Sequence, residues 1–385
     1  MKIALTNFMV ISFMLMSANL WSVNDAKITS SEFPKVLSEF EFFIDQTKQL
    51  PVKNVHPYEL ITTLFSDYSY KSRFIYVPVG KEGSYQKDWV YDFPVGTALI
   101  KTFYYPLDER NLDLGSNLLE TRVLLHKETG WEAVSYAWNE EQTEAFIKIA
   151  GKTINTSWVN HEGVSRDVRY RVPNMNQCKE CHSTNDVISP IGPKARNLDK
   201  DLVYRGEKKN QLAYLLEHGV IDSIPKGIQA VADWEDNSVP LQDRARAYLA
   251  VNCGHCHMPS GVANSTALYL DFNEIRPLHL GINKSPVATG RGSGSLKYSI
   301  VPGEADKSIL LYRMISTDPG VMMPESGRAL VHTEAVNLIE KWINSMSRWV
   351  MSEKEDLLNN LKIDRSQEGE SEPFPTKIVS ISFLD

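Results

Sequence analysis

Two short segments of this 385-residue chain repeat the pattern Cys-x-x-Cys-His, over residues 178–182 and 253–257. A Cys-x-x-Cys pair alone is equally compatible with a zinc site or a redox-active dithiol. A histidine directly after the second cysteine is typical of c-type haem attachment instead. There, two thiols bond to the edge of one haem and the histidine ligates its iron. The two pentads therefore predict two covalently bound haems.

All four cysteines of the chain belong to the pentads, so none remains for a disulfide. A zinc site would pool the four thiols and leave the two histidines without a role. We therefore predict that the cysteines attach the haems and that the histidines ligate the irons. These residues are Cys178, Cys181 and His182 for the first haem, and Cys253, Cys256 and His257 for the second.

The residues around the second pentad predict an all-α, class I-like cytochrome c domain over residues 238–350. Apolar residues recur at helical spacing over 241–251, directly before the pentad, and again over 333–346. In small cytochromes c two such helices cross beside the haem, and a methionine reaches the far side of the iron.

That methionine is available between the two predicted helices. Met322 and Met323 stand directly before Pro324. A thioether is a soft ligand that favours ferrous iron and raises the reduction potential. We predict Met323 as the sixth ligand of the second iron, with Met322 as the second choice. The alternative is that both methionines fill a loop or the core.

The first pentad has different neighbours. No methionine lies between His182 and Cys253, and the only histidine between the pentads is His218. Too little chain remains there for a separate cytochrome c domain, so we expect the first haem to pack on the preceding segment. Its sixth ligand could be His56, His126, His161, Met175 or His218, or the position could be open.

The preceding segment predicts an antiparallel β domain. Short β-branched and aromatic runs follow one another, separated by Gly, Pro, Asp and Asn. The runs are residues 73–79, 96–104, 120–126, 131–138, 147–149, 152–158 and 168–172. Helical spacing is found instead over 38–47, 57–68, 209–217 and 308–315.

These patterns divide the chain and give it an α+β fold class, with an N-terminal antiparallel β domain followed by the all-α domain. The predicted parts are a signal peptide (1–26), a mainly β domain packing on the first haem (27–177), a segment with the first pentad and a linker helix (178–237), the cytochrome c domain (238–350) and a tail (351–385).

The N-terminus predicts export. Lys2 precedes an apolar run over 3–21, and small and polar residues follow up to Ala26. An uncleaved membrane anchor is the alternative, but Asn7 and Asn19 within the run favour cleavage. We predict a periplasmic protein with no membrane span in the mature chain, because bacteria attach c-type haem outside the cytoplasm. The net charge is −7 without a basic stripe, which argues against a nucleic-acid partner.

Further segments resemble a family of exported dihaem c-type cytochromes of Gram-negative bacteria, whose physiological roles are largely unassigned. The resemblance covers most of the chain but not the tail 351–385. It rests on residues 93–97, 120–122, 136–138, 170–173, 177–182, 191–193, 210–213, 244–249, 252–257, 301–303, 308, 323–324 and 342–343. It implies an exported protein with two haems.

The β domain also resembles the β-sheet cytochromes that include cytochrome c′-β. The similarity lies in a strand that runs from Gly96 to Lys101 and in the aromatic-rich strands ahead of a haem pentad. It implies that the first haem lies against a sheet, with His182 on one side and an open or weakly ligated iron on the other. Lys101 would be the analogous strand lysine; its alternative interpretation is an exposed strand lysine.

Together these observations predict a dihaem c-type cytochrome that transfers electrons between periplasmic donor and acceptor proteins. The alternatives are a peroxidase-like haem enzyme or a gas-binding sensor at the first haem. A carrier is favoured over a catalyst because dihaem peroxidases join two small cytochrome domains, for which the chain between the pentads is too short. No catalytic residue is assigned.

Overall fold

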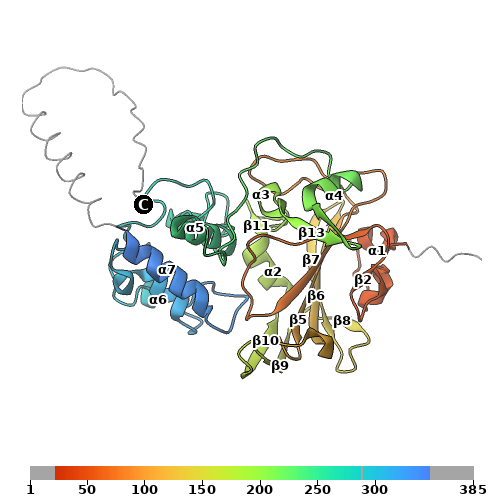
Figure 1. Ribbon diagram of the computed structural model, residues 1–385, viewed down its shortest axis with the longest axis horizontal. Helices are drawn as coiled ribbons and strands as arrows, with labels where there is room; N and C mark the ends of the chain where they lie inside the picture. Colours follow the sequence, from red (N-terminus) through yellow and green to blue (C-terminus); the bar gives the residue numbers. More distant parts are fainter. Residues whose placement is uncertain (1–21, 288, 347–385) are drawn as a thin grey trace, which may run out of the picture.

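The computed structural model describes residues 22–287 and 289–346. A six-stranded antiparallel sheet forms the centre of the first half, with its strands side by side in sequence order (Figure 1). Its strands are β3 (Val55–Pro57), β4 (Tyr70–Tyr76), β5 (Ala98–Pro106), β6 (Ser116–Lys127), β7 (Gly130–Trp138) and β8 (Ala145–Ile147). The antiparallel sheet predicted for this part of the chain is confirmed.

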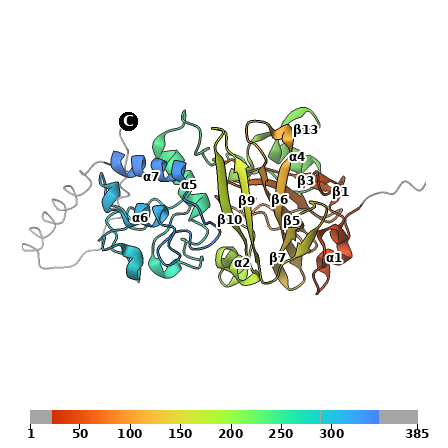
Figure 2. The ribbon, with the colours of Figure 1, turned by 90° about the horizontal axis from the view of Figure 1, so that it is seen from below.

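The other strands form two-stranded pairs. These are β1 (Phe43–Asp45) with β2 (Leu50–Pro51), β9 (Lys152–Val159) with β10 (Ser165–Val172), β11 (Ser183–Thr184) with β12 (Val187–Ile188), and β13 (Asp201–Tyr204) with β14 (Glu207–Asn210). The long hairpin of β9 and β10 lies on the side of the sheet that is nearest the helices of the second half (Figure 2).

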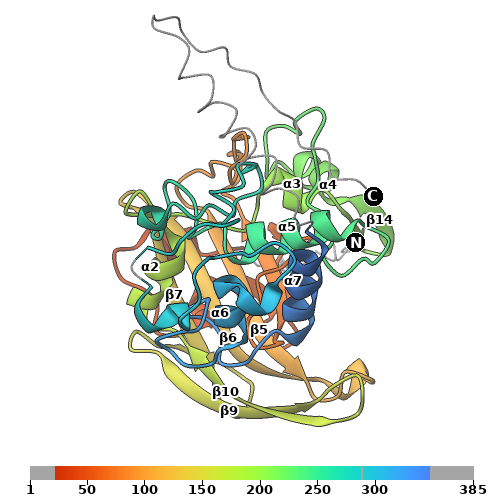
Figure 3. The same cartoon turned by 90° about the vertical axis from the view of Figure 1, so that its left-hand side faces the viewer.

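The α-helices of the described residues are α1 (Asp25–Thr29), α2 (Met175–His182), α3 (Ala195–Leu198), α4 (Gln211–Glu217), α5 (Leu241–Asn252), α6 (Ile309–Ile315) and α7 (Thr333–Ser345). The two longest of them, α5 and α7, lie in the second half. Seen from the side of the second half, α5, α6 and α7 lie in front of the sheet (Figure 3).

Alternation along the strands gives the sheet two different faces. On β5, Ala98 and Ile100 are buried in a core that includes Phe40 from the N-terminal segment. Leu99 points to the opposite side and belongs to a second core. Because successive side chains of a strand point to opposite faces, Lys101 shares the face of Leu99. That face is the one that meets the pentads.

The predicted fold class was wrong, because the second half is not an all-α cytochrome c domain. Among the described residues of this half, α5, α6 and α7 are the α-helices, and the described residues between 253 and 308 contain three 3-10 turns, irregular loops and isolated bridges such as Ile282 with Ile300. Glycines with positive φ, Gly281 and Gly303 among them, turn the chain where a helix would have to continue. The described residues form a mixed α/β structure with mostly antiparallel sheets.

The helices predicted over 38–47 and 57–68 were also wrong. Residues 43–45 pair with 50–51 as strands. Residues 58–69 form no helix because their backbone N–H groups are used elsewhere. The N–H of Thr62 donates to the Asn197 side chain (3.0 Å), and that of Glu59 donates to the Gln211 side chain (2.7 Å).

One loop of the first half joins it to the second half. The Asp67 carboxylate accepts hydrogen bonds from the backbone N–H groups of Ala329 (2.7 Å) and Leu330 (2.8 Å). The N–H of Phe65 donates to the side chain of Asn252, directly before the second pentad (2.8 Å). The two halves therefore meet through specific polar contacts close to the pentads.

The predicted signal peptide falls mostly on residues 1–21 and the predicted tail on residues 347–385, outside the described residues. The folded part includes residues before 27, since Val23 is buried and the N–H of Asn24 donates to the Phe40 carbonyl (3.0 Å). In the part of the chain that the structure describes, no helix is long and apolar enough to cross a membrane.

Candidate functional site

The first pentad is formed by the last turns of α2. The Asn174 side chain caps this helix by accepting a hydrogen bond from the N–H of Gln177 (2.9 Å), and the Gln177 side-chain oxygen accepts one from the N–H of Asn174 (3.0 Å). The helix lies against β7, and Cys178 packs on the apolar core beside the sheet. The first pentad is thus positioned by the sheet, as its lack of a separate domain predicts.

One ring nitrogen of His182 is held by a hydrogen bond. Its Nδ1 is 2.9 Å from the carbonyl oxygen of Ser189, which can only accept, so Nδ1 carries the proton. Burial lowers the pKa of His182 to about 4, so the ring is neutral at pH 7. A neutral imidazole whose Nδ1–H is held by a carbonyl offers Nε2 to a metal ion.

A cavity of about 400 Å³ lies beside this pentad. Its wall includes Cys178, Cys181 and His182, residues of β4, β5 and β6, and Gly254 and His255 from the second pentad. The size is within the range of roughly 300–1,000 Å³ that is usual for cofactor sites. The thiols, the neutral histidine and the adjoining cavity fit a covalently attached haem.

The second pentad follows α5 directly and is enclosed by a loop. A Cβ on Gly254 would lie 2.6 Å from the Ala250 carbonyl oxygen and 3.0 Å from Cα of Asp271. The N–H of Leu270 donates to the carbonyl of His257 (2.8 Å). This pentad therefore requires glycine at its second position, because the loop crosses it at backbone distance.

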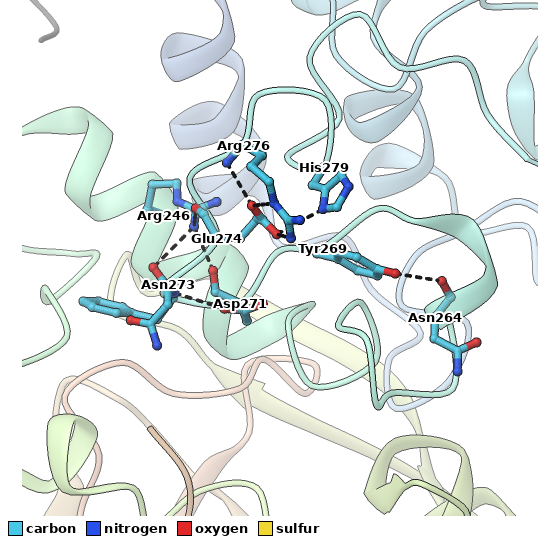
Figure 4. Close-up of polar contacts among 9 residues, drawn as sticks. Arg246, Asn264, Tyr269, Asp271, Asn273, Glu274, Arg276 and His279 are labelled. Carbon is cyan, nitrogen blue, oxygen red and sulfur yellow. Dashed lines mark hydrogen bonds and ion pairs between the residues drawn. The ribbon is translucent and has the colours of Figure 1, made fainter. Parts of the chain in front are cut away.

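A polar network fixes that loop (Figure 4). Arg246 of α5 donates to the backbone carbonyls of Asp271 and Glu274, both at 2.8 Å. The Glu274 carboxylate accepts a hydrogen bond from the Arg276 guanidinium, which lowers the pKa of Glu274 to about 2. The same carboxylate lies 3.2 Å from Nδ1 of His279. The loop over the second pentad is held by charged groups on both sides.

His257 is also available to a metal ion. Burial lowers its pKa to about 4, and its Nδ1 is buried without a hydrogen-bond partner among the described residues. Cys253 packs against an apolar core that contains Tyr248 of α5 and Trp342 of α7. A neutral histidine and an apolar wall around the thiol fit a haem at this pentad as well.

The Met322–Pro324 segment is joined to Arg313, whose charge acts on His257. The N–H of Met323 donates to the carbonyl of Arg313 (3.0 Å), and the Arg313 charge contributes to the low pKa of His257. Met322 is buried and lines the cavity beside the first pentad, whereas Met323 does not line it. Met323 as the ligand of the second iron stays a prediction.

The two pentads meet at three side chains. The Sγ atoms of Cys181 and Cys256 and a ring nitrogen of His255 all lie within 4.8 Å of one another. A hydrogen bond from the Cys256 thiol lowers the pKa of Cys181 below its ordinary value. The last cysteine of each pentad therefore lies beside that of the other. Sequence separation alone did not predict this.

None of the residues predicted as the sixth ligand of the first iron is among the described residues that line the cavity. His56 and His218 face each other in an aromatic cluster, and His126 stacks on a tryptophan. His161 is exposed, and Met175 begins the same helix that carries the pentad. None of these five side chains is brought to the cavity beside His182.

Sequence reasoning missed two features of this site. His255 occupies a variable position of its pentad, so its type carried no signal. Arg73, Lys101 and Arg122 line the cavity together, and Lys101 is partly buried rather than an exposed strand lysine. The sequence does place an Arg or Lys at an inward position of each of three neighbouring strands. This pattern can be recognised only when the register of the strands is known.

Comparisons of the chain with protein-family models, with curated proteins and with solved structures found no match.

Proposed function

We propose that the protein is a c-type cytochrome that carries two covalently attached haems and transfers electrons in the periplasm. The observation that carries the proposal is the meeting of the pentads, where the Sγ atoms of Cys181 and Cys256 lie within 4.8 Å of each other. Thiols of such pentads bond to haem edges. Cys181 and Cys256 would therefore hold two haem edges side by side.

Haem supplies a one-electron iron centre, and the protein supplies ligands, burial and local charge. Burial lowers the pKa of both His182 and His257 to about 4, so both rings are neutral at pH 7 and ready to ligate. Ser189 holds the ring of His182 through Nδ1. The apolar wall around Cys253 and the charged wall around His182 would give the two centres different potentials.

The test is to produce the full chain together with a bacterial haem-attachment system and to measure covalent haem per chain. We expect two haems, two separate steps in a redox titration, and exchange of electrons with small periplasmic redox proteins. A chain that matures without covalent haem would contradict the proposal. A fully loaded chain whose irons cannot be reduced and reoxidised reversibly would contradict the electron-transfer part.

A second candidate function is zinc binding, because Cys181, His255 and Cys256 form a three-ligand cluster. Two thiolates and one imidazole are common zinc ligands. Cys178 and Cys253 are outside the cluster, so it differs from a site that pools all four thiols.

His255→Ala separates the two functions. A haem protein would keep both haems in this variant, because His255 is neither an attachment residue nor a predicted iron ligand. A zinc protein would lose its metal, measured by elemental analysis of the purified chain. The pentads are used in full only by the haem function, which we therefore favour.

A further inference from the structure

Three cationic side chains form a row on the cavity face of the sheet. Arg73 of β4 pairs with Lys101 of β5, and Lys101 pairs with Arg122 of β6. Directly opposite residues of antiparallel strands share one face, with Cβ atoms about 5 Å apart. All three line the cavity next to His182. Like charges directly opposite one another destabilise a sheet. The row of three cations therefore lowers the stability of the folded protein.

A nearby acidic residue, Glu120, pairs with only one cation of the row, Arg122. Glu120 is fully buried; it accepts from Nε of Arg122 (2.8 Å) and from the Tyr170 hydroxyl (2.5 Å). In the described part of the chain, neither Arg73 nor Lys101 forms an ion pair, and the Lys101 ammonium lies 4.8 Å from the Phe103 ring. Two of the three cations therefore lack a carboxylate partner.

The whole cavity wall has the same excess of positive charge. Among the residues that the structure describes, seven Arg or Lys side chains line it against four Asp or Glu side chains. The cations are Arg73, Lys101, Arg122, Arg171, Lys194, Arg196 and Arg328, and the acids are Asp67, Asp88, Asp271 and Glu325. Asp88 and Glu325 already pair with Arg196 and Arg313.

Burial makes this excess costly. Arg73 is only 7 % exposed, and a guanidinium out of water without an anionic partner is unfavourable. Burial, followed by the charges of Arg73 and Arg122, lowers the pKa of Lys101 well below its ordinary value. A negative group in the cavity would reverse each of these costs, and guanidinium groups match planar oxyanions with two parallel hydrogen bonds.

We propose that Arg73, Lys101 and Arg122 bind an oxyanion in the cavity beside His182. The proposal rests on the proposed function, because it places the oxyanion at the first haem. The shared chemistry is a planar, negatively charged group of two or more oxygens. Its source is either a propionate of the haem or a free small oxyanion that reaches the iron side of the cavity.

The experiment uses the ferric holoprotein, with two haems per chain confirmed first. Wild type, Arg73→Gln and Lys101→Gln are titrated with sodium nitrite at ionic strength matched by sodium chloride, followed by optical difference spectra. The control is Arg169→Gln, an exposed strand arginine of β10. Reduction potentials of all four proteins are measured in parallel.

A free oxyanion predicts saturable nitrite binding that weakens at least about tenfold in both variants and is unchanged in the control. A propionate predicts no saturable nitrite binding, but a lower potential of the first haem in both variants, because removing a nearby positive charge stabilises ferric iron. Nitrite binding that is equal in all proteins, or no binding together with unchanged potentials, would overturn the proposal.

Two results would require a different variant or measurement. If Arg73→Gln does not fold, Lys101→Gln decides alone, because it replaces a partly buried residue at the same row. If the wild type matures without haem, the proposed function fails, and calorimetry of nitrite binding to that protein still decides the oxyanion site. Heat that disappears in Lys101→Gln would support the site, and absence of heat would overturn it.

Discussion

The two pentads have the same five-residue pattern but different surroundings. The first ends the short helix α2 against a sheet, beside a cavity whose wall carries excess positive charge. The second follows α5, is crossed at backbone distance by a loop, and packs on the apolar core of α5 and α7. The residues proposed for haem attachment are therefore local in the sequence, whereas ligand access and charge are set by residues far away in it.

The largest expected effect comes from removing one pair of thiols. Cys178→Ala with Cys181→Ala, and Cys253→Ala with Cys256→Ala, should each lower covalent haem from two per chain to one, because each haem needs its own pair. Intact mass and haem absorbance measure this. The two residual spectra should differ from each other; identical residual spectra would show that the two surroundings are equivalent.

The next effect concerns the second iron alone. Met323→Ala should change the spectrum of the second haem and lower its potential by at least about 60 mV, a tenfold change in a one-electron equilibrium, because a thioether favours ferrous iron. Met322→Ala is the matched control and should leave that haem's spectrum unchanged. The reverse result would assign Met322 as the ligand, and no change in either variant would exclude both.

The contact between the two regions should depend on pH. His332 stacks on Phe65 (4.1 Å between ring centroids) and its Nδ1 lies 3.0 Å from the Tyr248 hydroxyl. Burial lowers the pKa of His332 to about 4 from 6.5, so below pH 6.5 the unfolded chain binds a proton that the folded chain does not. Stability is therefore lost as the pH falls from 6.5 to about 4, by about 3 kcal/mol from this residue.

His332→Phe should remove that share of the pH dependence. Urea unfolding of wild type and variant at pH 7 and at pH 4 gives the unfolding free energy that each protein loses between these pH values. The difference between the two losses is the contribution of His332. Equal losses in wild type and variant would show that His332 does not carry a buried neutral ring between the regions.

The smallest expected effect tests the loop over the second pentad. Gly254→Ala should destabilise the protein by about 2 kcal/mol, because its Cβ would meet backbone atoms at 2.6 Å and 3.0 Å. Gly192→Ala in the first region is the control, since its Cβ would meet only the Leu60 side chain, at 3.4 Å. Similar unfolding free energies for both variants would argue against the close crossing at the second pentad.

Local patterns predicted the regular elements well. β5, β6, β7, β9, β10 and α4 to α7 fall on segments predicted as strands and helices, since alternation and helical spacing record which face is buried. β4 overlaps its predicted strand only over residues 73–76, and β8 shares only Ile147 with its predicted strand. Residues 57–68 were predicted wrongly as a helix, because the partners of their N–H groups, Asn197 and Gln211, lie far along the chain. The all-α domain failed for a related reason: helical spacing around a pentad says nothing about the long loops between the helices.

The candidate site was predicted only in its local part. The pentad residues could be named from spacing, but the contact of Cys181 with Cys256 depends on how the two halves dock. Likewise, the row of Arg73, Lys101 and Arg122 exists only because the strand register places them opposite one another. Register and docking are long-range properties that no short pattern encodes.

EPR of the fully oxidised holoprotein tests whether the two proposed haems lie side by side. The spectrum of the wild type is compared with the sum of the spectra of the two single-haem variants, Cys178→Ala with Cys181→Ala and Cys253→Ala with Cys256→Ala. We expect a wild-type spectrum that departs from this sum, because haems attached through the neighbouring Cys181 and Cys256 would bring their irons close enough for magnetic interaction. A wild-type spectrum that equals the sum would contradict the adjacency of the two haems. A spectrum without haem signals would contradict the proposed function itself.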